Sequence, residues 1–271
     1  YLSAPLQLAG MIAARTRRVM ISVSALLIPL HDPLRLAEDI AVLDLVSNGR
    51  FVATAGLGYR ETEYRMLGAD WERRGKILEE KLALMFTAWT GKSFEYRNTS
   101  VQLNPVPQTN PRHLITMGGN SRAAARRAAR LGLLFCPAID DPELAEAYYA
   151  ACKEYGFSSG FLIPPNYPAT TLLSDDPDQA WAEWGRYLLF DSKAYGAWEH
   201  KTRRAYAVSS ATTVEELRSE GKYRILTPAQ AVDVIEETGS LHLAPLCGGL
   251  PLDVGWQTLE LFASQVQISL R

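Results

Sequence analysis

The chain has 271 residues, of which 47% are hydrophobic, enough to build a full-sized core as one large domain or two small ones. Lysine and arginine together number 28 and aspartate and glutamate 30, so the formal net charge is −2. Because positive charge is not in excess, the chain has no field that would attract nucleic acid or an anionic membrane. The expected partners are small molecules and copies of the same chain.

Neither a membrane span nor a metal or disulfide framework is expected. Apolar runs stay well below the ~20 residues of a membrane helix, and the positive charges follow the first apolar segment, the reverse of a signal peptide. The cysteines at 136, 152 and 247 are far apart and form no C-x-x-C pair. These features predict a cytoplasmic protein. The chain begins with Tyr1 rather than Met, which suggests that an upstream segment is missing.

The first residues set a pattern of strands and helices. Residues 5–15 have helical spacing, and residues 18–30 are an almost wholly apolar run, typical of a strand in a parallel sheet covered on both faces. Asp32 and Pro33 then supply the N-cap and first-turn proline of a helix. The next strand is predicted over residues 50–58.

The same order repeats along the chain. Strands are predicted near residues 19–29, 50–58, 113–119, 133–138, 169–174 and 241–247. Each is followed by a helix, and short right-handed crossovers then favour either a (β/α)8 barrel or an open doubly wound sheet. Residues 157–226 are predicted to hold an insertion or lid, because the part after residue 192 is poorly periodic.

Two glycine-containing segments fall at the carboxyl ends of predicted strands, GLGY at 56–59 and MGGNS at 117–121. Glycine has no Cβ and lets a ligand approach the backbone closely, and in barrels this end of the strands carries the active site. Neither segment is a G-x-G-x-x-G that opens a helix directly, so a dinucleotide fingerprint is not supported. The barrel is therefore favoured over the doubly wound sheet.

The second segment leads into a helix at Asn120 and Ser121. Free amides and the helix dipole make such a terminus suited to a phosphate group. The alternative is that one of these two side chains only caps its own helix.

Longer stretches carry a resemblance to a known family. The segments are PLHDPLRLAEDIAVLDLVSNGRF (29–51), AGLGYRETEYRMLGADWERRGKILEE (55–80), MGGNSRAAARRAARLG (117–132) and GGLPLDVGWQTLELFASQV (248–266). They resemble the bacterial-luciferase-like family of flavin-dependent oxidoreductases, closely over residues 1 to about 150. The resemblance implies a single α/β domain over residues 1–271, a (β/α)8 TIM-type barrel that lacks its first strand, first helix and second strand in this chain.

The resemblance also implies a chemistry. The expected enzyme is a monooxygenase that uses reduced FMN and oxygen on a small organic substrate, with a separate flavin reductase as a partner. A deazaflavin-dependent hydride transfer is the alternative, and a non-catalytic flavin binder or truncated inactive form is a third reading. Family members commonly dimerise through helices that correspond to residues 5–15 and 33–47, so a homodimer is expected.

Site residues follow from the same resemblance. A non-proline cis peptide bond is expected between Val23 and Ser24, beneath the flavin ring. The expected cofactor-binding residues are Val23, Ser24, Gly56, Gly58, Tyr59, Gly118, Gly119, Asn120 and Ser121. Leu57 stands where some members have an arginine that contacts the phosphate, so that contact is in doubt. The catalytic base stays unknown, because the family's histidine-containing segment would precede residue 1.

Further residues are candidates for the walls of a substrate pocket. They are His31 in a strand-to-helix loop and Tyr195, Trp198, His200 and Tyr206 in the lid. The alternative is that the lid aromatics only form its core. His113 is expected to open a strand, and Asp44 and Arg50 are expected to form an ion pair across the turn between them.

Overall fold

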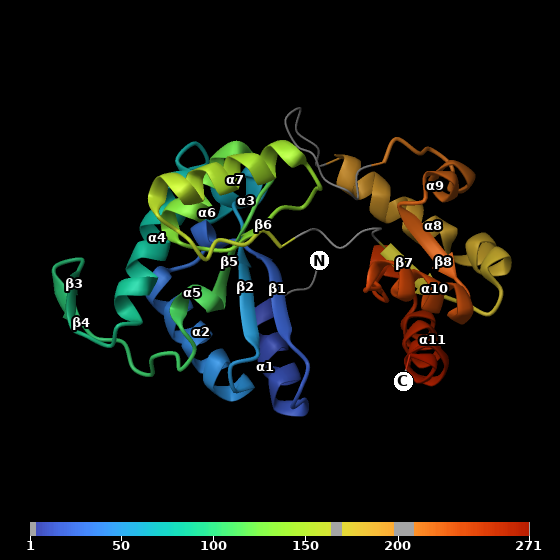
Figure 1. Cartoon of the computed structure of the whole chain (residues 1–271), viewed down its shortest axis with the longest axis horizontal. Coiled ribbons are helices and arrows are strands. Elements are labelled where there is room, and N and C mark those ends of the chain that lie inside the picture. The colour runs from blue at the N-terminus through green and yellow to red at the C-terminus, as the bar shows by residue number, and fades with distance from the viewer. Residues whose placement is uncertain (1–3, 164–169, 198–208, 271) are drawn as a thin grey trace. The chain divides into compact units, whose positions relative to one another are not determined.

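The computed structural model describes residues 4–163, 170–197 and 209–270 (Figure 1). The chain divides into two compact units, residues 1–164 and 165–271. Its organisation as a single domain stays a prediction. Among the described residues, no helix is long and apolar enough to cross a membrane.

The first unit is built on a parallel sheet. Its strands, in the spatial order β1-β2-β5-β6, are β1 (Ile21–Leu26), β2 (Phe51–Ala55), β5 (Ile115–Gly118) and β6 (Phe135–Cys136). Val23 pairs with Ala53, which in turn pairs with Ile115, so β1 pairs with β2 from its first residue and β5 pairs with the last three residues of β2. Four of the predicted strands are thereby confirmed, and their parallel pairing brings their carboxyl ends to one edge.

Helices surround this sheet (Figure 1). They are α1 (Pro5–Arg15), η1 (Ile28–Leu30), α2 (Pro33–Ser47), α3 (Glu61–Met66), α4 (Arg74–Ala88), α5 (Pro111–Leu114), α6 (Arg122–Leu131) and α7 (Pro142–Tyr155). A hairpin of β3 (Phe94–Tyr96) and β4 (Thr99–Val101) follows α4. His113 lies in α5, so its predicted place at a strand start is wrong. The reason is local, because Asn110 caps a one-turn helix by accepting the Arg112 amide at 3.0 Å.

The core of the first unit lies between the sheet and its helices. Leu36 and Ile40 of α2 and Leu78, Leu82 and Met85 of α4 are buried against the strands. The buried face of α6 consists of alanines at 124, 125, 128 and 129. Small side chains allow a helix backbone to lie close to its neighbours, which positions the α6 N-terminus beside the end of β5.

The predicted ion pair between Asp44 and Arg50 is wrong, because each side chain binds backbone instead. The fully buried Asp44 carboxylate accepts the Gln108 amide at 2.7 Å and the Thr109 amide at 2.9 Å. Asn48 is left-handed, and the chain then turns Arg50 toward the end of α1. Its guanidinium donates to the carbonyls of residues 13, 16, 19 and 47 and to the Thr16 hydroxyl.

The second unit is smaller. Its elements are β7 (Thr170–Leu173), α8 (Pro177–Ala197), α9 (Val214–Glu220), β8 (Tyr223–Leu226), α10 (Pro228–Thr238), η2 (Cys247–Gly249), α11 (Leu252–Leu261), η3 (Phe262–Val266) and α12 (Gln267–Ser269). β7 and β8 pair in parallel, and Leu172, Trp181, Trp184 and Tyr223 contribute to the core.

One strand prediction fails in this unit, and one segment contains elements that were not predicted. The segment 241–247 is not a strand, and only an isolated bridge joins Leu243 to Thr171, because Pro245 cannot donate to a ladder. The segment expected to be a poorly periodic lid contains α9 and β8. A capping box of Thr213 and Glu216 starts α9, and β8 has only four residues, too few to show a pattern in a charged stretch.

The buried carboxylate of Asp44 gives a first test. We expect Asp44→Ala to lower the free energy of unfolding by about 3 kcal/mol, because two loop amides and the Thr109 hydroxyl lose a charged acceptor. This corresponds to a fall of roughly 6–12 °C in the thermal midpoint. Asp39→Ala, an exposed change on the same helix, is the control and should leave the midpoint nearly unchanged. Equal midpoints for the two variants would contradict the assignment.

Candidate functional site

The carboxyl ends of β1 and β2 approach each other closely. The Gly56 amide donates to the Leu26 carbonyl at 2.9 Å, and a Cβ added at Gly56 would lie 2.7 Å from the Ala25 Cβ. Only glycine fits this position without a shift of one strand. The non-proline cis peptide bond lies between Ser24 and Ala25. The predicted position, between Val23 and Ser24, is wrong by one residue, because the register shift in β1 falls between Ser24 and Leu26.

The two faces of β1 differ at this end. The Val23 side chain is buried in the core of the first unit, whereas Ser24 and Ala25 are exposed. Of the two predicted β1 residues, only Ser24 therefore has an exposed side chain. Val23 is limited to supporting the strand from the core side.

The GLGY loop is fixed by a hydrogen bond from Tyr64, a residue that the sequence patterns did not indicate as part of the site. Tyr64 of α3 is fully buried, and its hydroxyl donates to the Leu57 carbonyl. Its ring packs edge-on against Trp71, with centroids 5.1 Å apart. Burial raises the pKa of Tyr64 to about 12, so the hydroxyl stays a donor. The signal that the sequence offered for this contact was a tyrosine seven residues after Leu57.

The second glycine pair also has packing reasons. A Cβ at Gly118 would lie 2.9 Å from Thr54 Cγ2, and one at Gly119, where φ is +143°, would lie 2.6 Å from the Ala124 Cβ. In the strands below, the hydroxyls of Thr116 and Thr54 are hydrogen-bonded at 3.1 Å and buried. The glycines thus let β5 and α6 approach their neighbours, a role separate from any ligand.

Both polar side chains at the start of α6 bind protein atoms. Ser121 Oγ accepts the Ala124 amide at 3.2 Å, so the Ser121 side chain caps its own helix. Asn120 Oδ1 accepts the Ala138 amide at 2.8 Å, which ties the β5–α6 loop to the segment after β6. The amides of Arg122 and Ala123 lie in the first turn, where the helix itself supplies no acceptor. Any anion here would therefore be bound mainly by backbone.

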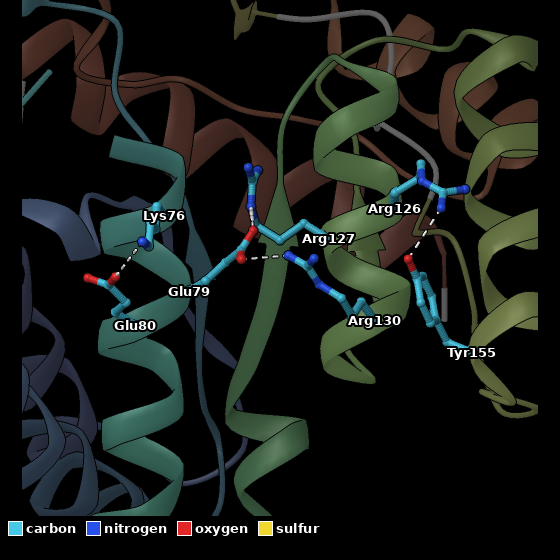
Figure 2. Close-up of polar contacts among 7 residues, drawn as sticks. All are labelled: Lys76, Glu79, Glu80, Arg126, Arg127, Arg130 and Tyr155. Atoms are coloured by element: carbon cyan, nitrogen blue, oxygen red, sulfur yellow. Dashed lines mark hydrogen bonds and ion pairs between the residues drawn. The ribbon is translucent and has the colours of Figure 1, made fainter. Parts of the chain in front are cut away.

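A shared carboxylate fixes the position of α6. Figure 2 shows Glu79 of α4 between two arginines of α6, Arg127 at 2.7 Å and Arg130 at 2.5 Å. On the other side, Arg126 donates to the Tyr155 hydroxyl at 3.2 Å and pairs with Glu154 at 2.9 Å. Arg127 and Glu79 are largely buried, so this pair orients α6 more than the exposed ones do.

His31 lies at a different place from the strand-end glycines. It lines a cavity of about 550 Å³ whose walls come from the β1–α2 loop, the loop after α3, α4 and the hairpin. Burial, and next the charge of Lys81, lower its pKa. Lys81 Nζ donates to the carbonyls of Pro29 at 2.7 Å and His31 at 2.5 Å. None of the predicted cofactor-binding residues lines this cavity.

The remaining substrate-pocket candidates belong to the second unit. Tyr195 lies in α8 and is half-buried. Trp198, His200 and Tyr206 lie outside the described residues. A role in substrate binding therefore stays a prediction for all of these residues and for His31.

The contact between Gly56 and Ala25 gives a second test. We expect Gly56→Ala to lower the thermal midpoint by roughly 2–12 °C, because overpacking at this distance costs about 1–3 kcal/mol. The control is Gly10→Ala in α1, where the added Cβ would meet its nearest neighbour at an ordinary 3.6 Å. That change should be neutral or slightly stabilising, since alanine favours a helix. If Gly56→Ala behaves like the control, the close approach is wrong.

Comparison with known proteins assigns the chain to a family. The model of the family described as luciferase-like monooxygenase matches residues 1–238. A relative in Pseudomonas putida, described as an FMNH(2)-dependent dimethylsulfone monooxygenase, is 28% identical over 186 residues, or 65% of this chain and 51% of that protein. The chain spans about half the length, or less, of the first curated relatives that it matches.

Solved structures show the same fold. The oxygenating constituent of 3,6-diketocamphane monooxygenase from Pseudomonas putida, in complex with FMN, has a TM-score of 0.64 at 18% identity and is matched over 98% of this chain and 84% of that chain. An F420-dependent secondary alcohol dehydrogenase has a TM-score of 0.65 at 16% identity, over 97% and 83%. The predicted α/β barrel fold class is confirmed by these likenesses.

Proposed function

Because the chain belongs to the luciferase-like monooxygenase family, we propose that it is a flavin-dependent oxidoreductase. It would bind reduced FMN and, with oxygen, monooxygenate a small organic substrate. The match over residues 1–238 carries this proposal, and the flavins named for the relative and for the solved structure support FMN as cofactor.

The described residues fit a flavin at the strand ends. Ser24 and Ala25 are exposed beside Gly56, so backbone without bulky side chains faces the edge where β1 and β2 end. The ring would be held there, by Ser24 with Val23 behind it and by the loop of Gly56, Gly58 and Tyr59. The phosphate would be held at Gly118, Gly119, Asn120 and Ser121, through first-turn amides of α6.

Oxygen activation or hydride transfer would be supplied by the bound flavin. The chain's own residues would orient the ring, exclude water from it and position the substrate. Ser121 and Asn120 would act indirectly, because their side chains fix the loop that presents the amides. His31, Tyr195, Trp198 and His200 remain proposed substrate contacts.

The phosphate site gives a third test, based on residue 122. Arg122 is the first helical residue after Ser121, whose extended backbone is compatible with a following proline. Arg122→Pro removes one amide donor without breaking the helix, and we expect it to weaken FMN binding about tenfold, since a hydrogen bond to a charged group is lost. Riboflavin, which lacks the phosphate, should bind equally well to both forms. Fluorescence titration measures both ligands.

The matched control is Arg122→Ala, which removes the same side chain and its ion pair with Glu143 but keeps the amide. It should bind FMN like the parent chain. An equal loss in both variants, or an equal loss for riboflavin, would refute phosphate binding by this amide.

The second candidate function is hydride transfer with a deazaflavin, favoured by the F420-dependent neighbour. Titration with FMN and with F420, followed by oxygen uptake with NADH and an added flavin reductase, distinguishes the two. Preferred binding of F420 without oxygen uptake would support the deazaflavin enzyme. Tight FMN binding without turnover would support a non-catalytic flavin binder. The FMN proposal includes a separate reductase and a cytoplasmic location.

We also propose a homodimer formed through α1 and α2. Leu8, Met11 and Ile12 of α1 and Val42, Leu45 and Val46 of α2 are exposed, each trio with the i, i+3, i+4 spacing of one helix face. The exposed fractions reach 66% at Met11 and 52% at Val46. Monomeric proteins rarely expose contiguous apolar surface of this kind.

The dimer gives a fourth test, by light scattering at micromolar concentration. We expect the parent chain to be dimeric and Ile12→Glu to be monomeric, because a buried unpaired charge would oppose association. Met66→Glu changes an apolar residue that is 83% exposed on α3 and should stay dimeric. A monomeric parent chain would refute the interface.

A further inference from the structure

The cavity beside His31 has features of a binding site. Its volume of about 550 Å³ lies in the range of pockets that hold small organic molecules. Apolar side chains supply part of the wall, among them Leu67 after α3 and Ile77 and Leu84 of α4. A ligand with an apolar body would therefore be accommodated against α4.

Two cations, Lys81 and Arg97, line this cavity, and neither forms an ion pair within the described part of the chain. Lys81 is held by two backbone carbonyls, which leaves the third donor of its ammonium group for a ligand. Arg97, at the hairpin tip, lies over the Tyr96 ring at 4.9 Å.

The carboxylates on the same walls are already engaged. Asp32 accepts the amides of residues 34 and 35, and Asp70 accepts those of residues 72 and 73. Glu80 pairs with Lys76 at 3.8 Å, as Figure 2 shows, and with Arg73 at 3.7 Å. Helix-start amides and cations thus hold these three carboxylates, whereas the ammonium group of Lys81 and the guanidinium group of Arg97 keep donors available to a ligand.

The two cations also act on each other. Burial lowers the pKa of Lys81; Asp32 opposes this effect, and Arg97 adds to it. Like charges brought together at one cavity are costly unless an anion lies between them.

We propose that this cavity is a binding site for a small organic anion, whose carboxylate or phosphate group is bound by Lys81 and Arg97 and whose apolar body lies against Leu67, Ile77 and Leu84. The site is separate from the strand ends and does not rest on the proposed flavin chemistry. Its ligand is recognised by one anionic group and an apolar part of benzoate size or larger.

The experiment is calorimetric titration of the full chain with three probes of one shape, namely benzoate, benzyl alcohol and benzylamine. We expect benzoate to bind best. In Lys81→Gln its affinity should fall about tenfold or more, because a charged hydrogen bond is lost. In Arg97→Gln it should fall about two- to fivefold, since this cation is exposed and screened. Lys92→Gln removes an exposed cation that does not line the cavity and should leave the affinity unchanged.

Three results would overturn the proposal. They are absence of benzoate binding to the parent chain, equal affinity in the parent and both cavity variants, or binding of benzylamine or benzyl alcohol as tight as that of benzoate. Should Lys81→Gln fail to fold, the exposed Arg97→Gln variant decides. Repeating the titration with saturating FMN tests whether the two sites are separate. If they are, the affinity for benzoate should not change.

Discussion

The first unit depends on two opposite charges that bind backbone rather than each other. Asp44 holds the loop that precedes β5, and Arg50 holds the end of α1 to the start of β2. A buried carboxylate is costly unless its oxygens accept hydrogen bonds, and here the loop amides satisfy it. Both segments are thereby fixed at the amino-terminal edge of the sheet, which leaves the opposite edge available for a site.

At that opposite edge, the glycines serve packing first. Gly56 and Gly118 admit neighbouring protein atoms where any side chain would collide. The consequence for a ligand is indirect, because strands that approach so closely present backbone at their ends. Asn120 and Ser121 complete this arrangement by fixing the loop through their side-chain oxygens, while the amides of the first turn have no acceptor within the helix.

The sequence predicted local structure better than it predicted partners. The caps at Asp32 and Ser121 and the apolar strands could be predicted, because these signals lie within a few residues of the elements that they define. Asp44 accepts the amide of Gln108, which lies 64 residues away in sequence, and no local spacing encodes that contact. β8 was missed because its four residues are too few to show a period within a charged stretch. The cavity beside Lys81 likewise joins a loop, a helix and a hairpin that are distant in sequence.

Tyr64 has a consequence for how tightly any guest is retained. Its hydroxyl donates to the Leu57 carbonyl, and Asn120 Oδ1 accepts the Ala138 amide, so each of these two loops is tied to another segment of the first unit before a ligand binds. Association then loses little conformational entropy in ordering them. Proteins that share these two hydrogen bonds would differ in ligand preference through segments that lack such bonds. Exchanging those segments would alter selectivity and leave the two loops unchanged.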